Sequence, residues 1–201
     1  NPLTPMRLSV QSFQRKFNSN DIDVYQKIEE YSKTLIQQID TMSSIASAFS
    51  NFAKMPAQQN ETLNVVEVVN LALDIFTEDY LLFECASQEI IAKLDRTQLI
   101  RIITNLVKNA IQSIIHSQNP VIRICLDDDE DNVIVTVSDN GHGITEENKP
   151  KVFEPKFTTK TSGMGLGLPM IKNIIETYKG SIDFDSVEGS GTIFKVVLPK
   201  S

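Results

Sequence analysis

The stretch that decides the fold is Val137-Ser138-Asp139-Asn140-Gly141-His142-Gly143-Ile144. Residues 133–138 show period-two alternation around an apolar centre, which predicts a strand. This strand leads directly into an aspartate and two glycines that stand one residue apart. Asn-Gly is a strong signal for a hairpin turn, and a simple hairpin is one interpretation of the stretch. However, the segment after Ile144 is polar, contains two prolines and shows no alternation, which is typical of a lid or a binding loop.

The position of Asp139 indicates a specific chemistry. A carboxylate buried at the end of a strand can accept a hydrogen bond from the exocyclic amine of adenine. Guanine presents an oxygen at the same place, so two acceptors would face each other. An aspartate in this position could therefore select adenine over guanine.

A predicted helix over residues 95–117, capped by Asp95, carries a polar stripe beside its apolar face. The stripe consists of Arg101, Asn105, Asn109, Gln112 and His116. Such a stripe is commonly the solvated face of an amphipathic helix. Asparagine is a poor residue for the middle of a helix, however, so two of them at positions i and i+4 are unusual for that purpose. Their amide oxygens could serve as neutral ligands for a magnesium ion that also holds phosphates.

A glycine string, Gly163-Met164-Gly165-Leu166-Gly167, precedes a predicted helix over residues 168–178. Alternating glycines let backbone amides approach phosphates at a helix N-terminus, and Pro169 suits the first helical turn. The spacing is neither that of a Rossmann fingerprint nor that of a P-loop.

The segment before the glycine string has a net charge of +3 over residues 149–160 in an otherwise acidic chain. Its charged residues are Lys149, Lys151, Lys156, Lys160 and Glu154. Thr158 and Thr159 add hydroxyl donors. Such a segment suits an anionic ligand, although a solvated surface loop has the same composition.

The remaining sequence predicts an α+β chain of two parts. Apolar residues at heptad spacing predict helices over residues 3–17 and 24–54, joined by a turn at residues 18–21. This helical hairpin would bury its apolar stripes in a four-helix bundle made by two chains, or by packing onto its own chain. After a linker come the further predicted elements: a helix over 65–76 and strands over 81–85, 89–94, 121–126, 181–185 and 192–198. We expect helices on one face of a mixed sheet.

Composition excludes several classes. The chain has 201 residues and a net charge of −7, which argues against nucleic-acid binding. Two cysteines and two histidines are too few for a disulfide scaffold or a zinc enzyme. No apolar run reaches the ~18 residues of a membrane span, so we expect no membrane contact. Because the chain begins at Asn1 without a methionine, we expect it to be a piece of a longer protein.

Taken together, the ordered motifs resemble the catalytic, ATP-binding domain of sensor histidine kinases, which has the Bergerat fold of the gyrase-type ATPases. The resemblance covers about residues 61–201. Residues 105–109 correspond to the N box, 139–143 to the first glycine box, 153–160 to the F box and 163–167 to the second glycine box. Lys156 departs from the aromatic or apolar residue common in the F box.

The resemblance implies ATP or ADP with Mg²⁺ as ligands, Asn109 as the magnesium ligand, and catalytic roles for Asn105, Asn109 and Lys160. The nucleotide-binding residues that it implies are Asn105, Asn109, Gln112, Asp139, Gly141, Gly143, Ile144, Thr158, Thr159, Lys160, Gly163, Gly165, Leu166, Gly167, Leu168 and Thr192.

The N-terminal residues Asn1-Pro2-Leu3-Thr4-Pro5 resemble the end of the H box of nitrogen-regulation-type sensor kinases. By this resemblance residues 1–55 are the dimerisation and phosphoacceptor hairpin, 56–60 a linker and 61–201 the catalytic domain. The phosphoaccepting histidine would lie four positions before Asn1, outside this sequence. We do not expect His116 or His142 to replace it.

The predicted function is transfer of the ATP γ-phosphoryl group to a histidine for relay to the receiver domain of a response regulator. ATP-hydrolysing members of the superfamily carry a general-base glutamate where this chain has Asn105, and an amide cannot take a proton from water. The alternative is a nucleotide-sensing scaffold or phosphatase-type partner of a response regulator with little kinase activity. We expect a homodimer in the cytoplasm, or the cytoplasmic part of a membrane-anchored sensor.

Overall fold

The computed structural model describes residues 3–16, 24–53, 58–115, 117–155 and 165–201. The chain divides into two compact units, residues 1–55 and residues 56–201. Among the described residues, none of the helices combines the length and the apolar run that a bilayer crossing requires.

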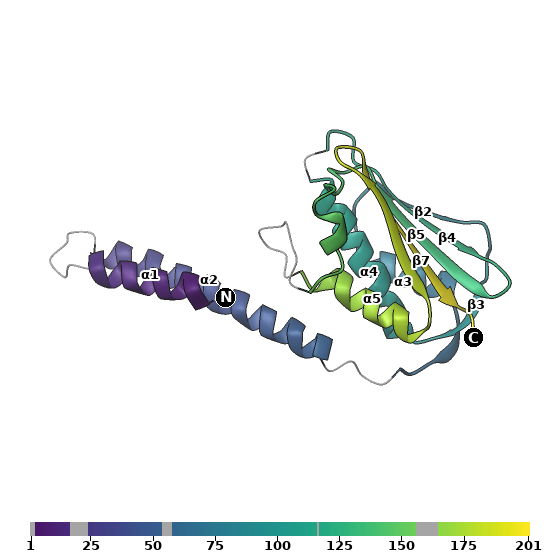
Figure 1. Cartoon of the computed structure of the whole chain (residues 1–201), viewed down its shortest axis with the longest axis horizontal. Helices are drawn as coiled ribbons and strands as arrows, with labels where there is room; N and C mark the ends of the chain where they lie inside the picture. The colour runs from purple at the N-terminus through teal and green to yellow at the C-terminus, as the bar shows by residue number, and fades with distance from the viewer. Residues whose placement is uncertain (1–2, 17–23, 54–57, 116, 156–164) are drawn as a thin grey trace. The chain divides into compact units, whose positions relative to one another are not determined.

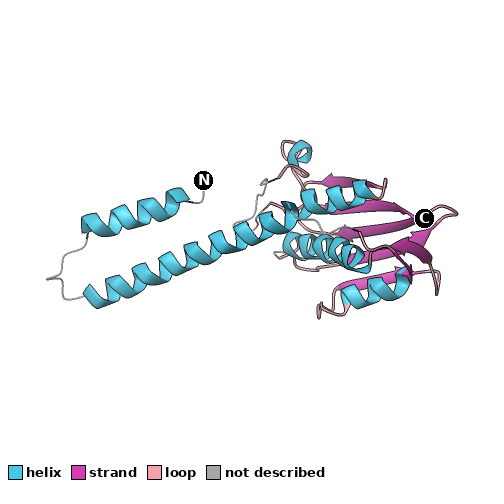
Figure 2. Ribbon diagram, turned by 90° about the horizontal axis from the view of Figure 1, so that it is seen from below, coloured by secondary structure: helices cyan, strands magenta, loops and turns pink. Residues whose placement is uncertain are grey.

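The first unit consists of two helices that lie side by side, α1 (Leu3–Lys16) and α2 (Val24–Ala53) (Figures 1 and 2). The aromatic rings of Phe13 and Tyr31 stack between them, with centroids 4.1 Å apart. Both rings belong to the predicted apolar stripes. The predicted turn at residues 18–21 lies outside the described residues.

The second unit is built on a five-stranded sheet in the order β2-β4-β5-β7-β6. Its strands are β2 (Leu81–Cys85), β4 (Ile122–Asp128), β5 (Asn132–Asp139), β6 (Ser181–Val187) and β7 (Gly191–Pro199). The β2–β4 pair is parallel and the other three pairs are antiparallel, so the sheet is mixed, as predicted. A separate antiparallel pair joins β1 (Glu61–Asn64) to β3 (Ile91–Leu94).

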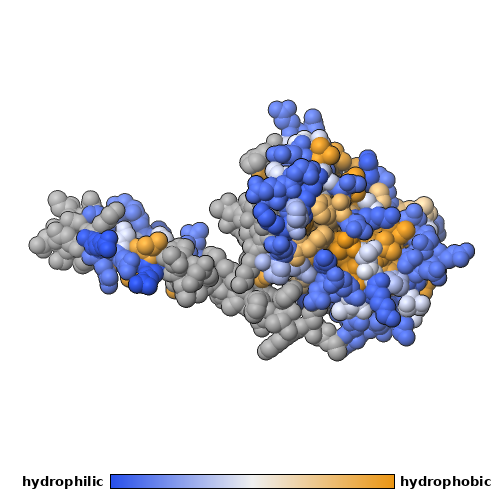
Figure 3. All heavy atoms as spheres, in the orientation of Figure 1, coloured by the Kyte–Doolittle hydropathy of each residue, from blue (hydrophilic) through white to orange (hydrophobic). Residues whose placement is uncertain are grey.

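The helices cover one face of this sheet (Figures 1 and 2). They are α3 (Val65–Leu73), α4 (Arg96–Ser113) and α5 (Gly167–Thr177), and the short 3₁₀ helix η1 (Lys149–Lys151) lies between β5 and α5 in the sequence. Every second residue of β5 is buried, and the apolar side of α4, from Ile102 to Ala110, is buried as well. Alternation in a strand and 3.6-residue periodicity in a helix bring these two apolar faces together. On the face that Figure 3 shows, apolar residues of the second unit form a central area ringed by hydrophilic ones.

The predicted elements are present, with differences at their ends. Asp95 caps α4 as predicted, since its carboxylate accepts a hydrogen bond from Gln98 N at 3.0 Å. The helix ends at Ser113 rather than at residue 117, because the Ser113 carbonyl accepts from His142 N (3.2 Å) instead of continuing the helix. Strand β1 was not predicted. It has four residues, of which only Leu63 is buried, so it shows no alternation that a pattern could detect.

Within the second unit, Tyr178 and Asp95 hold residues 59 and 60 in place. Tyr178 Oη accepts a hydrogen bond from Asp95 N (3.0 Å) and donates one to Asn60 Oδ1 (3.2 Å). Gln59 N in turn donates to Asp95 Oδ2 at 2.9 Å. Burial raises the pKa of the Tyr178 hydroxyl, so it stays protonated near neutral pH and can donate as well as accept.

We expect Tyr178→Phe to lower the free energy of unfolding by about 1–2 kcal/mol, because the Asp95 amide loses its acceptor. Urea unfolding of the two proteins measures the difference. Equal midpoints would mean that the hydroxyl contributes nothing to stability.

Candidate functional site

Asp139 lies at the end of β5, in the middle of the main sheet. Ser113 Oγ and Gly141 N each donate a hydrogen bond to its Oδ1, both at 2.9 Å. A carboxylate has about four lone-pair positions, so two donors orient the group and leave it able to accept from a ligand. The side chain that the sequence singled out is thus half-buried and held in one orientation.

Burial raises the pKa of the Asp139 carboxyl, and the donors at Gly141 and Ser113 oppose the shift. Because the folded-state pKa lies above the unfolded one, ionised Asp139 destabilises the native state at neutral pH. That penalty is relieved as the pH falls through the folded-state pKa. A group that makes the fold less stable when charged is typical of a functional site.

The two glycines after Asp139 are required by close contacts. A Cβ on Gly141 would stand 2.0 Å from Ser113 Oγ. Gly143 has a φ of +68°, and a Cβ there would stand 2.2 Å from the carbonyl oxygen of Val187. The glycine loop, residues 140–144, therefore packs closely between the end of α4 and the β6–β7 turn. At Gly141 and Gly143 no other residue type fits.

Asn105 and Asn109 lie along α4, between the glycine loop and the start of α5. A Cβ on Gly167 would stand 2.9 Å from Asn105 Oδ1, so the glycine string contacts the stripe directly. Asn109 lies one helical turn further along, and Ser113 one turn beyond it, beside Asp139. Eight residues of helix between Asn105 and Ser113 cover about 12 Å. The carboxylate, the amides and the glycine string, all far apart in sequence, thus line one continuous path.

The two asparagines differ in their bonding. Asn105 Nδ2 donates to the Arg101 carbonyl at 2.8 Å, within its own helix. Asn109 is half-buried, and within the described part of the chain its amide makes no hydrogen bond. An amide oxygen without a partner can serve as one of the oxygen ligands that Mg²⁺ takes.

Other predicted residues lie along the same path. Gly165 has a φ of +62°, Leu166 is buried just before α5, and Gly167 and Leu168 form its first turn. Backbone N–H groups at such a helix start have no partner within the helix and attract anions. Thr192 is buried and pairs with Asp139 across the β5–β7 ladder. The predicted residues Lys156, Thr158, Thr159, Lys160, Gly163 and His116 lie outside the described residues.

The remaining two predicted residues lie at the edge of this path. Ile144 is half-buried, and its amide donates a hydrogen bond to Ser186 Oγ of β6. Gln112 is exposed on α4.

The basic character of the segment before the glycine string is weaker than the sequence count suggested. Lys149 pairs with Glu146, and Lys151 pairs with Glu147 at 3.4 Å. Both glutamates stand just outside the counted window, and including them lowers the net charge from +3 to +1 over residues 146–160. Neither described lysine is therefore an unpaired cation for a ligand.

Sequence reasoning missed two polar residues, Ser113 and Ser186. Ser113 could have been found, since it continues the i, i+4 series of Asn105 and Asn109. Ser186 accepts a hydrogen bond from Ile144 N at 2.8 Å, and no sequence pattern connects these two positions, which are 42 residues apart.

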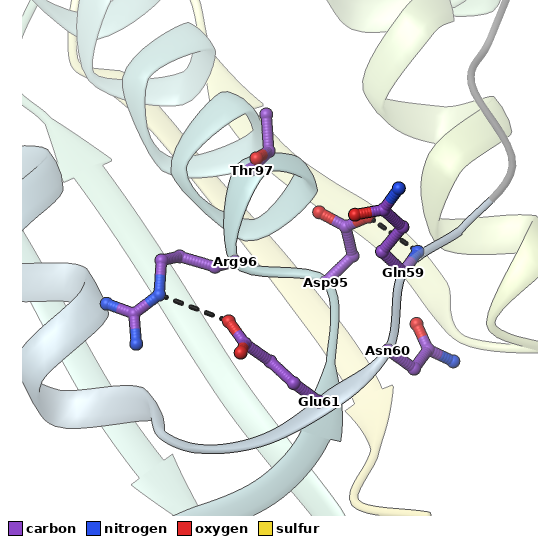
Figure 4. Close-up of a pocket in the computed structure, with 6 residues that line it drawn as sticks. All are labelled: Gln59, Asn60, Glu61, Asp95, Arg96 and Thr97. Atoms are coloured by element: carbon purple, nitrogen blue, oxygen red, sulfur yellow. Dashed lines mark hydrogen bonds and ion pairs between the residues drawn. The ribbon is translucent and has the colours of Figure 1, made fainter.

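A polar hollow of about 400 Å³ lies elsewhere, at the N-terminal end of α4 (Figure 4). Its lining residues are Gln59, Asn60, Glu61, Asp95, Arg96 and Thr97. The 18 residues of α4 span about 27 Å, so this hollow is a full helix length from Ser113 and Asp139. It contains none of the predicted ligand-binding residues.

Comparisons with known proteins show the family of the chain. The family model of histidine kinase-, DNA gyrase B- and HSP90-like ATPases matches residues 94–201. A sensor histidine kinase NtrY-like protein of Rickettsia conorii is 32% identical over 200 residues, covering 98% of this chain and 33% of that protein. The nitrogen regulation protein NtrY of Azorhizobium caulinodans is 27% identical over 208 residues, covering 98% of this chain and 27% of that protein.

Solved structures give the same result. The catalytic domain of histidine kinase ThkA is 34% identical, with a TM-score of 0.63, and covers 71% of this chain and 96% of that one. The structure of ThkA in complex with response regulator protein TrrA has a TM-score of 0.72 at 24% identity, covering 100% of this chain and 58% of that one.

The chain therefore belongs to the family of histidine kinase-, DNA gyrase B- and HSP90-like ATPases. Within it, the similarity is to sensor histidine kinases, including those of the nitrogen-regulation type, which confirms the resemblance of the sequence motifs. The chain spans about a third of the length of the curated relatives that it matches first.

Proposed function

We propose that this chain is the ATP-binding catalytic part of a sensor histidine kinase, which transfers the γ-phosphoryl group of ATP to a histidine. The observation that carries the proposal is the path from Asp139 along α4 to Gly167. It offers an oriented carboxylate at one end, amides in the middle and a glycine-rich helix start at the other. These are the groups that a purine, a metal-bound phosphate chain and its terminal phosphates each require.

Asp139 would recognise the base. Its carboxylate accepts hydrogen bonds and donates none, so the 6-amino group of adenine is a suitable partner and the 6-oxygen of guanine is not. Since Ser113 and Gly141 already hold the carboxylate, it cannot turn away to avoid a guanine. Specificity would thus come from repulsion between the Asp139 carboxylate and the 6-oxygen of guanine, which are both hydrogen-bond acceptors.

Asn109 would hold Mg²⁺ through its amide oxygen, with Lys160 and the Gly165 and Gly167 amides near the phosphates. The ion neutralises phosphate charge when it is bound. The residues of this chain position the nucleotide: the α5 N-terminus attracts the phosphate groups, and Asn105 packs against Gly167 at its start.

We expect Asn109→Ala to weaken ATP binding in the presence of Mg²⁺ by about tenfold or more, and to leave binding in EDTA nearly unchanged. Calorimetric titrations with and without the metal measure both values. Equal losses under the two conditions would remove Asn109 as the magnesium ligand.

The residues favour transfer to a protein over hydrolysis. By the sequence resemblance, Asn105 occupies the position of the general-base glutamate of ATP-hydrolysing members, and its amide is bonded within its own helix. An imidazole needs no such base, because one ring nitrogen already carries a lone pair. That nitrogen would attack the γ-phosphorus while the bond to the bridging oxygen breaks, and ADP leaves with the electron pair.

The accepting histidine would lie outside this sequence. His142 is a poor candidate because it lies in the glycine loop, at the adenine end of the proposed site rather than at the α5 end, where the phosphates would lie. We further propose a response-regulator receiver domain as the final acceptor and a location on the cytoplasmic side of the membrane. The complex of ThkA with TrrA supports the choice of partner.

We also propose that the first unit forms a homodimer. After α1 and α2 pair, several apolar side chains remain exposed, among them Leu8, Ile36 and Ile39 at 60%, 58% and 53%. Two such hairpins could bury them in one four-helix bundle. Sedimentation equilibrium should therefore find twice the chain mass of 22.5 kDa, and a monomer at all concentrations would contradict the dimer.

Kinase activity can be tested with a partner dimer that carries the histidine hairpin but lacks its own ATP-binding domain. Mixed with this chain and radiolabelled Mg²⁺-ATP, the partner should acquire phosphate on its histidine. Absence of label, in spite of ATP binding to this chain, would favour the nucleotide-sensing scaffold instead.

A further inference from the structure

The glycine loop that follows Asp139 is fastened to the β6–β7 hairpin at two adjacent points. Gly189 N donates to the His142 carbonyl at 2.8 Å, and Ile144 N donates to Ser186 Oγ at 2.8 Å. These two bonds flank Gly143, the residue that leaves no space for a side chain against Val187. The hairpin therefore determines how far the loop stands from the sheet.

Ser186 has a special place in this contact. Its side chain is 5% exposed, and its hydroxyl lies 3.0 Å from the Gly191 carbonyl oxygen and 2.9 Å from Thr192 Oγ1. One hydroxyl has one proton and two lone pairs, so the bond from Ile144 N and a donated bond into the hairpin hold it in place. A hydroxyl fixed in this way is a rigid point of attachment for the loop.

Ser186 also lies in register with Asp139. Asp139 pairs with Thr192 across β5–β7, and Thr192 pairs with Ser186 across β7–β6, so the three residues form one row across the sheet. The row connects the carboxylate to the attachment point through two neighbouring strands. A hydroxyl needed only for the hairpin would not have to reach Ile144, which belongs to the loop.

We propose that Ser186 is a positioning residue for base recognition. Through its bond to the Ile144 amide, Ser186 fixes the position of residues 140–144 relative to the sheet. It thereby also positions the Gly141 amide, which orients the Asp139 carboxylate. This inference rests on the proposed role of Asp139 as the partner of adenine. Ser186 itself would not touch the nucleotide.

The test is the ratio of ATP to GTP affinity in Ser186→Ala. Loss of the hydroxyl frees the Ile144 amide and lets the loop shift, so the ATP affinity should fall about tenfold. The weaker GTP affinity, which depends on the phosphates, should change less than twofold. Hydrogen exchange at the Ile144 amide should become faster. Ser186→Thr keeps the hydroxyl and should restore most of the preference for ATP.

Tyr178→Phe is the matched control, because it also removes one bonded hydroxyl but lies at the opposite end of the domain. It should lower stability and leave the ATP to GTP ratio unchanged. If Ser186→Ala keeps the wild-type ratio, or loses both affinities equally, Ser186 is not a positioning residue.

Asp139→Asn, measured in the same experiment, distinguishes a wrong role for Ser186 from a wrong adenine site. If that variant loses the preference while Ser186→Ala keeps it, only the role of Ser186 is wrong, whereas an undiminished preference in Asp139→Asn overturns the proposed adenine site itself.

Discussion

Asp139→Asn should abolish the thermal stabilisation that ATP confers on the chain. Ser113 Oγ and Gly141 N both need an acceptor, so the amide oxygen of the new asparagine would face them. Its NH₂ group would then point toward the adenine amine, and two donors would meet where a donor and an acceptor met before. At a ligand concentration of one hundred times Kd, binding stabilises a protein by about 2.7 kcal/mol, and this entire contribution should disappear.

Asp139→Asn should still fold, which makes the experiment decisive. Because burial raises the pKa of this carboxyl, replacing the charge with a neutral amide should leave the stability without nucleotide equal or slightly higher. Differential scanning fluorimetry with and without Mg²⁺-ATP measures both effects. An unchanged ATP-dependent shift would remove Asp139 as the recognition group.

Gly143→Ala should be among the most damaging single substitutions in the second unit. The new Cβ would stand 2.2 Å from the Val187 carbonyl oxygen, which is backbone and cannot rotate away, and the residue would also have a φ of +68°. Strain and clash together should cost about 3 kcal/mol or more and separate the loop from the hairpin. Urea unfolding and ATP titration should both report the loss.

Gly189→Ala is the matched control for this effect. Gly189 also has a positive φ, +79°, and lies in the turn that Gly143 contacts, but a Cβ there meets no atom within 4 Å. It should therefore suffer the backbone strain alone, about 1 kcal/mol. Equal destabilisation by the two substitutions would show that the close contact at Gly143 has no energetic weight.

Local patterns were sufficient to predict most of the elements. The alternation of apolar residues in β5 and the 3.6-residue periodicity of α4 follow from burial on one side, which sequence alone reveals. Strand β2 has the predicted bounds, and Asp95 caps α4 as predicted. Strand β1 was not predicted, because a four-residue strand with one buried side chain shows no alternation of apolar and polar residues.

Long-range contacts could not be predicted in the same way. The end of α4 is set by a hydrogen bond from His142, which stands 29 residues after Ser113, so no local signal marks it. The pairing of Glu146 and Glu147 with two lysines is, by contrast, local, and counting charges over a wider stretch of sequence would have found it. The motifs that carry the proposed chemistry were visible because each is short, and only the fold brings Asp139, Asn109 and Gly167 onto one path.

Calorimetric titration of the chain with Mg²⁺-ATP and with Mg²⁺-GTP tests the central claim most directly. An oriented carboxylate that can only accept should bind the adenine nucleotide at least about a hundredfold more tightly, because GTP would leave two acceptors in contact. Equal affinity for the two nucleotides, or no binding of ATP, would contradict the claim.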